Sequence, residues 1–153
     1  MNKKRIILLV ILAAVLTGGL IAYKMWNKPF ADASSGDAIQ VTSVQLFKDF
    51  NSNEAAAQKK YVPQTLGSTV VEVSGNIKEV GKNDAAETYF YLATGDPSAG
   101  VKCIIEKGSE ISDAKAGDNV VIRGFCDGIK KDTIMDLVIM DIIINRCKPL
   151  KAK

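Results

Sequence analysis

The spacing of apolar residues divides the chain into three stretches. Residues 6–23 contain no charged side chain. Residues 43–61 carry apolar side chains at intervals of three, which is the period of one face of a helix. From residue 68 onward apolar residues alternate with polar ones, as half-buried β-strands require. The pattern predicts an apolar leader, a short helical segment and a mainly β domain.

The leader is long enough to cross a membrane. Its eighteen uncharged residues, at ~1.5 Å rise per residue, span roughly 27 Å, close to the hydrocarbon thickness of a bilayer. Three basic residues precede it, and Tyr23 and Trp26 stand at its far end, where aromatic rings favour the headgroup region. We expect an anchor at residues 1–26, in an inner membrane, with the rest of the chain in the periplasm.

A cleaved signal peptide is the alternative to this anchor. Ala31-Asp32-Ala33 matches a small-x-small cleavage pattern, and cleavage there would release a secreted protein. The apolar run is longer than a signal peptide needs, and residues 24–30 separate it from that pattern. An anchor is therefore the favoured interpretation. No cysteine directly follows the run, which excludes a lipoprotein attachment.

A linker and two short helices are expected next. Residues 27–42 are small, polar and aperiodic, which is typical of a linker. The helical segment covers 43–64, with Ser43 as the first N-cap and Asn53 as the second. The apolar face of the first helix consists of Val44, Phe47 and Phe50.

Five strands account for the β-rich part. They are expected at 69–77, 88–92, 101–105, 120–126 and within 134–145. The longer insert, 106–115, falls between the third and fourth strands, and Asp127-Gly128 is expected to start a turn. Asp136 and Asp141 are an odd number of residues apart, so both cannot face water on one regular strand. We expect a bulge or two short segments there.

The order of several short motifs resembles a known family. They are Asn53-Glu54-Ala-Ala-Ala, Val71-Glu-Val-Ser-Gly75, Val101-Lys-Cys103, Ala116-Gly-Asp-Asn-Val-Val-Ile-Arg-Gly124 and Cys126-Asp-Gly128. Together they resemble the tRNA-anticodon-binding-like OB family of membrane-anchored bacterial envelope proteins, over residues 43–147. The resemblance implies a five-stranded OB-fold barrel at 65–150. One departure is that members carry a cysteine in the final strand, near Asp141, whereas here Cys147 comes later.

Charge is distributed unevenly along the chain. The net charge is +3, but residues 1–30 carry five lysines and arginines and no acid. Residues 69–150 carry ten basic and thirteen acidic residues, so the β-rich part is mildly acidic. A phosphate-backbone partner usually requires a basic surface. Nucleic acid is therefore an unfavoured partner.

The residue types argue against catalysis. The chain has no histidine, which removes the commonest general base and metal ligand. It has no glycine-rich phosphate loop and no paired-cysteine metal motif. Asp127 and Asp132 flank one turn, where acids are normally just solvated. We expect no enzyme activity, no cofactor and no metal.

Two cysteines share the inward face of the predicted strands. Alternation along each strand puts Cys103 on the opposite face from Lys102, and Cys126 on the opposite face from Arg123. In an oxidising compartment Cys103 and Cys126 could form a disulfide, and the alternative is two buried free thiols. Cys147 is the odd cysteine and is expected to be free.

Two tyrosines are the candidate ligand-binding residues. Tyr89 and Tyr91 share one face of the second strand, and if Phe90 fills the core they stand outside. OB barrels often bind ligands on such a face. With Lys102 and Arg123 they would form a stacking platform for bases or sugars. The alternative is that the helical segment, through Phe47, Phe50 and Tyr61, covers them.

These observations favour a binding or structural module over an enzyme. We expect a membrane-tethered, non-catalytic OB-fold domain that contacts a protein or glycan in the envelope. The alternative is a single-stranded nucleic-acid-binding domain, which the fold resemblance implies. The oligomeric state cannot be derived from the sequence.

Overall fold

The computed structural model describes residues 17–21, 23, 32–34, 37–63, 69–109, 113–134 and 136–152. The chain forms two compact units, Met1–Phe30 and Ala31–Lys153. In the first unit, residues 17–21 and 23 are helical, and Leu20, Ile21 and Tyr23 are exposed. Within the described ranges no helix is long and apolar enough to span a bilayer. The remainder of the expected anchor lies outside the described residues.

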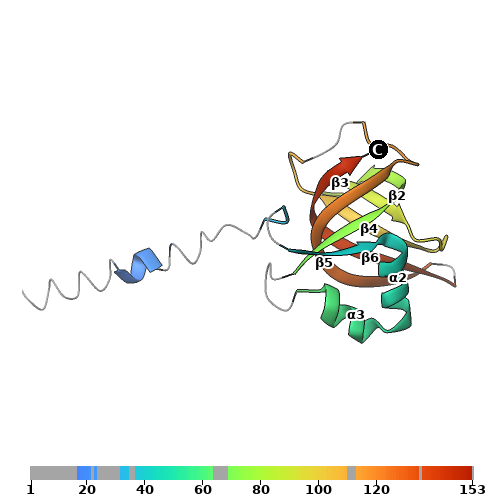
Figure 1. The fold of residues 1–153 in the computed structure, drawn as a ribbon, viewed down its shortest axis with the longest axis horizontal. Coiled ribbons are helices and arrows are strands. Elements are labelled where there is room, and N and C mark those ends of the chain that lie inside the picture. The colour runs from blue at the N-terminus through green and yellow to red at the C-terminus, as the bar shows by residue number, and fades with distance from the viewer. Residues whose placement is uncertain are drawn as a thin grey trace, which may run out of the picture. The chain divides into compact units, whose positions relative to one another are not determined.

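The second unit is built on one six-stranded β-sheet (Figure 1). The strands are β1 (Ala38–Thr42), β2 (Val70–Lys82), β3 (Thr88–Ala93), β4 (Ala99–Ile105), β5 (Asn119–Ile134) and β6 (Leu137–Ala152). Their order is β1-β2-β3-β4-β6-β5, and β2 also pairs with β5. The mainly β architecture is therefore confirmed.

The sheet curves back on itself because β2 has two sets of partners. Its residues 77–82 pair with β3, and its residues 71–76 pair with β5. The expectation of a simple five-stranded barrel was incomplete, since β1 adds a sixth strand, parallel to the start of β2. This strand falls within the stretch expected to be a linker.

The junction of β1 with the first helix is fixed at a glycine. A Cβ at Gly75 of β2 would overlap the hydroxyl of Ser43, so the bare glycine lets Ser43 approach the sheet. The Ser43 Oγ donates to the carbonyl of Ala93, at the end of β3, over 2.6 Å. Gly75 and Ser43 thus hold β1 and the helix against β2 and β3.

Two helices, α2 (Ser43–Ser52) and α3 (Glu54–Tyr61), lie together at one end of the sheet (Figure 1). The N-cap of α2 is Thr42 rather than Ser43, because the Thr42 Oγ1 accepts from the Gln45 backbone N–H over 3.1 Å. Asn53 caps α3 as expected, accepting from the Ala56 N–H over 3.0 Å. Val44, expected on the apolar face, is 53% exposed.

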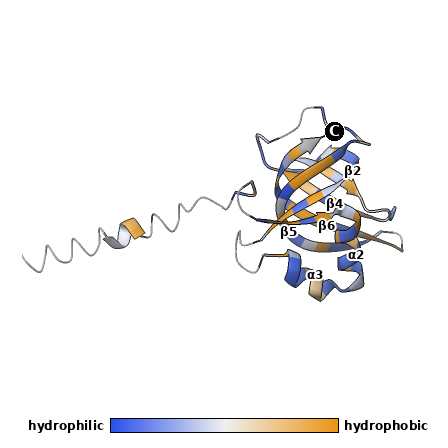
Figure 2. Ribbon diagram, in the orientation of Figure 1, coloured by the Kyte–Doolittle hydropathy of each residue, from blue (hydrophilic) through white to orange (hydrophobic). Residues whose placement is uncertain are grey.

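The core lies between the curved sheet and α2, and Figure 2 shows apolar residues along the strands that enclose it. Strand parity places Val71, Val73 and Ile77 of β2 inside, as the sequence predicts. The largest fully buried side chains include Tyr61, Phe50, Phe90, Leu46 and Leu92. The helices therefore close one end of the sheet with their aromatic side chains.

The long hairpin of β5 and β6 differs from the expected pattern. β5 continues through the expected turn at Asp127-Gly128, where the register shifts by a bulge. The chain reverses only after Ile134, and Asp136, with φ of 66°, lies in the connection before β6. Asp136 and Asp141 therefore do not share a strand, which resolves their conflicting parity.

Candidate binding face

The candidate site lies on the outer side of β3. Burial alternates along this strand: Phe90 and Leu92 are fully buried, and Tyr89 and Tyr91 are half-buried and face outward. We use the name tyrosine face for Tyr89 and Tyr91 together with Lys102 of β4 and Lys78 of β2. The parity of β3 alone predicts the outward direction of both tyrosines.

The ring of Tyr89 lies on a glycine of the neighbouring strand. Tyr89 and Gly81 are paired residues of β3 and β2, and a Cβ at Gly81 would lie 2.5 Å from the Tyr89 Cζ. The Tyr89 Oη donates to the Glu79 Oε1 over 2.7 Å. This hydrogen bond to Glu79 raises the pKa of Tyr89, with burial adding to the effect. The ring is held at both its face and its hydroxyl.

Tyr91 is held in the same way but toward the opposite side. A Cβ at Gly100 of β4 would overlap its ring, and its Oη donates to the Asp141 Oδ1 of β6. Burial, followed by the hydrogen bond to Asp141, raises the pKa of Tyr91 far above the ordinary 10.0. Tyr91 therefore remains a neutral donor at physiological pH.

Two lysines lie over these rings. The Lys102 Nζ is 4.4 Å from the Tyr89 ring centroid, and the Lys78 Nζ is 5.5 Å from that of Tyr91. The Lys78 ammonium also donates to the Pro97 carbonyl over 3.1 Å. Both distances are within the range of cation–π attraction. The outer side of β3 thus presents two fixed aromatic rings with a cation above each.

The helical segment does not cover the tyrosines. Phe47, Phe50 and Tyr61 belong to the buried core, and Phe50 and Tyr61 stack on each other with centroids 6.1 Å apart. Asp49 fixes the Tyr61 hydroxyl, which donates to its Oδ2 over 2.6 Å. The helical aromatics are thus used within the fold, and the tyrosine face stays at the surface.

Arg123 lies apart from the tyrosine face. It is on β5, directly opposite Glu72 of β2, and its Nε donates to the Glu72 Oε2 over 2.7 Å. The two side chains are only 22% and 15% exposed. Arg123 also donates to the Ser34 carbonyl over 3.4 Å. Of the four expected ligand-binding residues, the structure therefore brings Tyr89, Tyr91 and Lys102 together and places Arg123 elsewhere.

Sequence reasoning missed the residues that position the rings. Glu79, Asp141, Gly81 and Gly100 come from three strands, and their convergence depends on register. The available signal was the two glycines, because glycine within a strand often marks a close approach.

Three cysteines are buried in the core as free thiols. Cys103 of β4 and Cys126 of β5 both pair with Ile144 of β6, so β6 runs between them. The Cys147 Sγ donates to the Ile144 carbonyl over 3.2 Å. Burial raises the pKa of Cys126 to about 11 and that of Cys147 well above its ordinary 9.0. A Cys103–Cys126 disulfide was expected as one of two alternatives, and it stays a prediction. It would have to connect β4 and β5 across the intervening strand β6.

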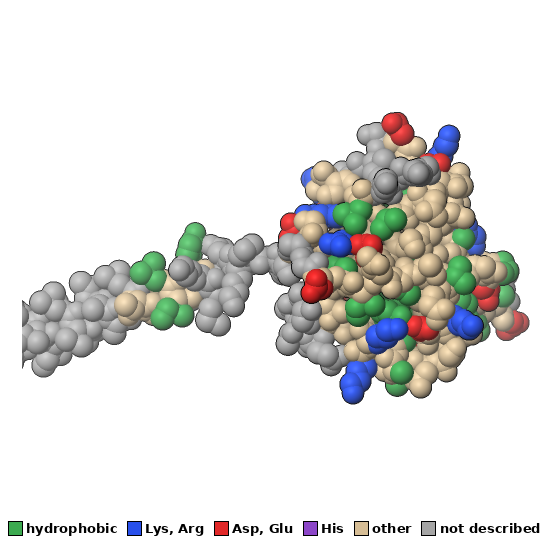
Figure 3. Space-filling model, viewed as in Figure 1, with side chains coloured by type: hydrophobic (Ala, Val, Ile, Leu, Met, Phe, Trp, Pro, Cys, Tyr) green, Lys and Arg blue, Asp and Glu red, His purple; other side chains and the backbone are tan. Residues whose placement is uncertain are grey.

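The surface charge is mixed rather than basic. On the side drawn in Figure 3, lysines and arginines are scattered among aspartates and glutamates. Over the described part of the chain, no three cysteine or carboxylate side chains gather in a way that would hold a metal ion.

A shallow groove of about 390 Å³ lies where β1, α2 and β2 meet, and none of its lining side chains is charged. Its lining includes Thr42, Ser43, Ser74, Asn76 and Asn119.

Comparison with known proteins gives a family and distant structural likenesses. The model of the tRNA_anti-like family matches residues 1–138. Among solved structures, a putative aspartyl-tRNA synthetase from Leishmania major Friedlin is similar over 88% of this chain, with 8% identity and a TM-score of 0.37. The similarity covers 26% of that synthetase chain, about a quarter of its length. No curated protein matches this chain.

Proposed function

Because the chain belongs to the tRNA_anti-like family, an OB-fold family, we propose that it is a non-catalytic binding module tethered to a bacterial inner membrane. Its folded domain faces the periplasm and contacts a protein or glycan through the tyrosine face. The apolar leader of residues 6–23 supplies the tether, and the basic residues before it supply the orientation.

The fixed geometry of Tyr89 and Tyr91 carries this proposal. Each ring rests on a glycine, and each hydroxyl is held by a carboxylate. A partner that binds such rings does not have to order them first, and preorganisation of this kind increases affinity. Aromatic side chains are also enriched among the residues that dominate binding energies.

Nucleic acid is the second candidate, and Lys102 is the observation that favours it. The Lys102 ammonium lies over the Tyr89 ring, so a phosphate that draws it aside would uncover an aromatic surface for a base to stack on, the combination that binds single strands. The mild acidity of residues 69–150 opposes it. A periplasmic location would also separate the domain from cytosolic RNA.

The test compares two kinds of probe on the full chain in detergent. We expect solubilised peptidoglycan fragments, or a cross-linked envelope protein, to be retained by the natural chain. Retention falls with Tyr89→Ala plus Tyr91→Ala, and it is unchanged with Leu150→Ala, which alters a residue that is 48% exposed on β6. Equal retention by both variants would contradict the assignment of this face.

The second probe is a labelled single-stranded oligonucleotide. We expect no binding at physiological salt. Binding that weakens steeply as salt rises, and that is lost with Lys102→Ala but not with Lys82→Ala, would instead establish the nucleic-acid candidate. Lys82 is an exposed lysine at the end of β2, so it is a matched control for charge. Orientation is tested with a reporter fused after Lys153. Reporter activity only in the cytosol would contradict the periplasmic orientation.

A further inference from the structure

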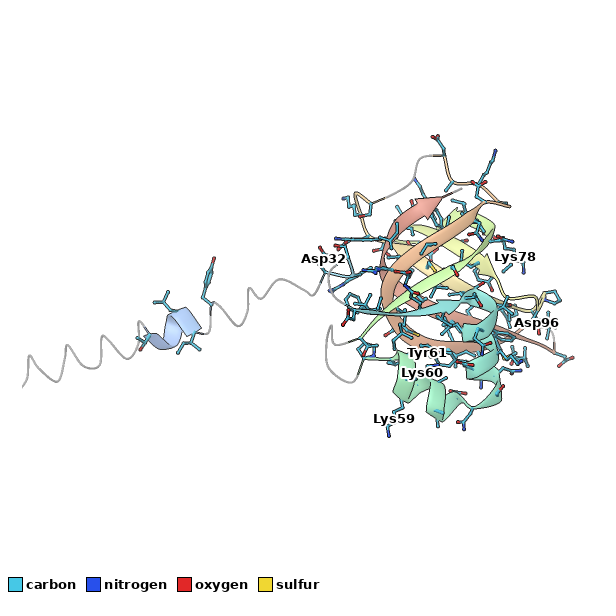
Figure 4. The ribbon with its side chains drawn as sticks, viewed as in Figure 1. Asp32, Lys59, Lys60, Tyr61, Lys78 and Asp96 are labelled. Atoms are coloured by element: carbon cyan, nitrogen blue, oxygen red, sulfur yellow. The ribbon has the colours of Figure 1, made fainter. Side chains whose placement is uncertain are left out.

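Residues 32–34, just before the sheet, are bound to its outer side. They come from the stretch expected to be a linker, yet they belong to the same compact unit as the sheet. Two contacts connect them to the sheet, one to β5 and one to β6. Figure 4 labels Asp32 on one side of the sheet and Lys78, of the tyrosine face, on the other side. The two surfaces are therefore separate.

Lys148 of β6 is the first point of attachment. Its Nζ lies 2.7 Å from the Asp32 Oδ1 and 3.2 Å from the Glu106 Oε2. Glu106 follows β4, so Lys148 joins the incoming segment to the body of the sheet. The hydrogen bond from Lys148 lowers the pKa of Asp32 to about 2, and it raises the pKa of Lys148.

Arg123 of β5 is the second point. Arg123 and Lys148 are paired residues of neighbouring strands, so their side chains emerge on the same side of the sheet. Arg123 is oriented by Glu72, and its Nη1 donates to the Ser34 carbonyl over 3.4 Å. A guanidinium held by a carboxylate is a preoriented donor, which suits it to a backbone acceptor.

Ala33, which lies between these two contacts, is buried. Its side chain is only 2% exposed, although both neighbouring residues are exposed. An unattached linker would leave an alanine open to water. The buried Ala33 is therefore flanked by two contacts with the sheet. The Asp32 carboxylate binds Lys148, and the Ser34 carbonyl binds Arg123.

We propose that Arg123 and Lys148 form a docking surface for the chain's own residues 32–34, and that these residues remain part of the mature protein. Ala31-Asp32-Ala33 is the stretch that a signal peptidase would recognise, and cleavage after Ala33 would remove Asp32 and Ala33 from the docked segment. The fold therefore includes residues that cleavage would discard. The leader stays attached to the domain. Arg123 binds the segment that follows the leader and does not bind the ligand.

The retention of the leader rests on the proposed membrane tether, whereas the docking rests on the contacts alone. The first measurement is the intact mass of the full chain, expressed in a bacterium and extracted from its membranes. We expect a mass that includes the leader. A mature chain that begins at Ser34 would overturn the inference. Partner binding through Tyr89 and Tyr91 is measured separately, so its failure would leave this result unaffected.

The second measurement is limited proteolysis of the folded full chain, followed by mapping of cuts at the 32–33 and 33–34 bonds. Lys148→Ala should raise the rate of these cuts about two- to fivefold, because protection follows the local opening equilibrium. Lys107→Ala, at an exposed lysine in the turn after β4, should leave the rate unchanged. Lys148→Arg should restore most of the protection.

Thermal unfolding of each variant shows whether the domain itself has been weakened. If Lys148→Ala unfolds at the same temperature as the natural chain and its cuts still appear faster, docking is supported. If it unfolds at a lower temperature, the Asp32→Asn chain replaces it, because Asp32 lies outside the sheet. Rates at these bonds that are equal in the natural chain and in Asp32→Asn would overturn the docking.

Discussion

The ring of Tyr91 of β3 lies over Gly100 of β4, which pairs with Ala93, two residues further along β3. A Cβ at position 100 would overlap the ring, so the glycine and the tyrosine are mutually required. The hydroxyl beyond Gly100 reaches Asp141 on β6. One side chain therefore spans three strands.

Replacing Gly100 should disturb this arrangement. Gly100→Ala is expected to destabilise the domain by about 1–3 kcal/mol, since a well-packed site cannot take an extra methyl group without displacement. Denaturant unfolding measures the change. In a Tyr91→Ala background the same substitution should cost much less. Equal costs in both backgrounds would show that the ring is not what Gly100 accommodates.

The ionisation of Tyr91 should make the domain sensitive to alkali. Its pKa in the folded chain is above the ordinary 10.0, so the folded state holds this proton more tightly than the unfolded state does. The resulting stabilisation is complete below pH 10 and is lost as the pH rises toward the folded pKa. Urea midpoints from about pH 8 to about pH 11 should fall less steeply for Tyr91→Phe. Parallel curves for the two chains would refute this.

Arg123 should matter for stability and not for the tyrosine face. Arg123→Ala leaves Glu72, which is 15% exposed, without its facing cation, and should cost about 1.5–3 kcal/mol. Glu72→Gln in the same chain should recover part of the loss, because it removes the unpaired charge. Calorimetry measures the stability, and the binding assays above measure the face. If Arg123→Ala lost binding but kept normal stability, the result would show that Arg123 belongs to the ligand site.

The three thiols should be inert in the folded protein. Cys103, Cys126 and Cys147 are each at most 1% exposed, and burial raises the pKa of Cys126 to about 11. A bulky maleimide should label none of them in native protein, and all three after denaturation without reductant. A count of one after denaturation would reveal a disulfide. β6 lies between the strands of Cys103 and Cys126, so their Cα atoms are separated by two strand spacings of about 4.8 Å each. The total is wider than a disulfide usually spans.

Alternation along the strands was enough to predict which side chains face inward. Phe90 and Leu92 fill the core, and Tyr89 stands outside, as a period of two requires. The same rule could not place Arg123 relative to Tyr89. Both point outward, but a sheet that curves back on itself has outward directions on opposite sides. Only the register of β2 with β3 and β5 distinguishes them.

Other features depended on partners distant in the sequence. β1 is only five residues long, and its parallel partner begins at Val70, so no local pattern reveals it. The sequence left the environment of the cysteines open because inward direction does not give the distance between two strands. The burial of Ala33 was hidden for the same reason, since a small residue among polar ones is typical of a linker.

The pairing of β2 with β5 joins parts of the chain that are far apart in the sequence. Glu72 and Arg123, which meet across that pairing, are 51 positions apart in the chain. Their meeting is a high-contact-order event, and such contacts form slowly because loop closure must precede them. When the chain emerges N-terminus first, β2 is present before any of β5. Residues 71–76 of β2 therefore lack their β5 partner at that stage. In whichever compartment the domain folds, the β2 edge stays unpaired until residues 119–124 of β5 are available to pair with it.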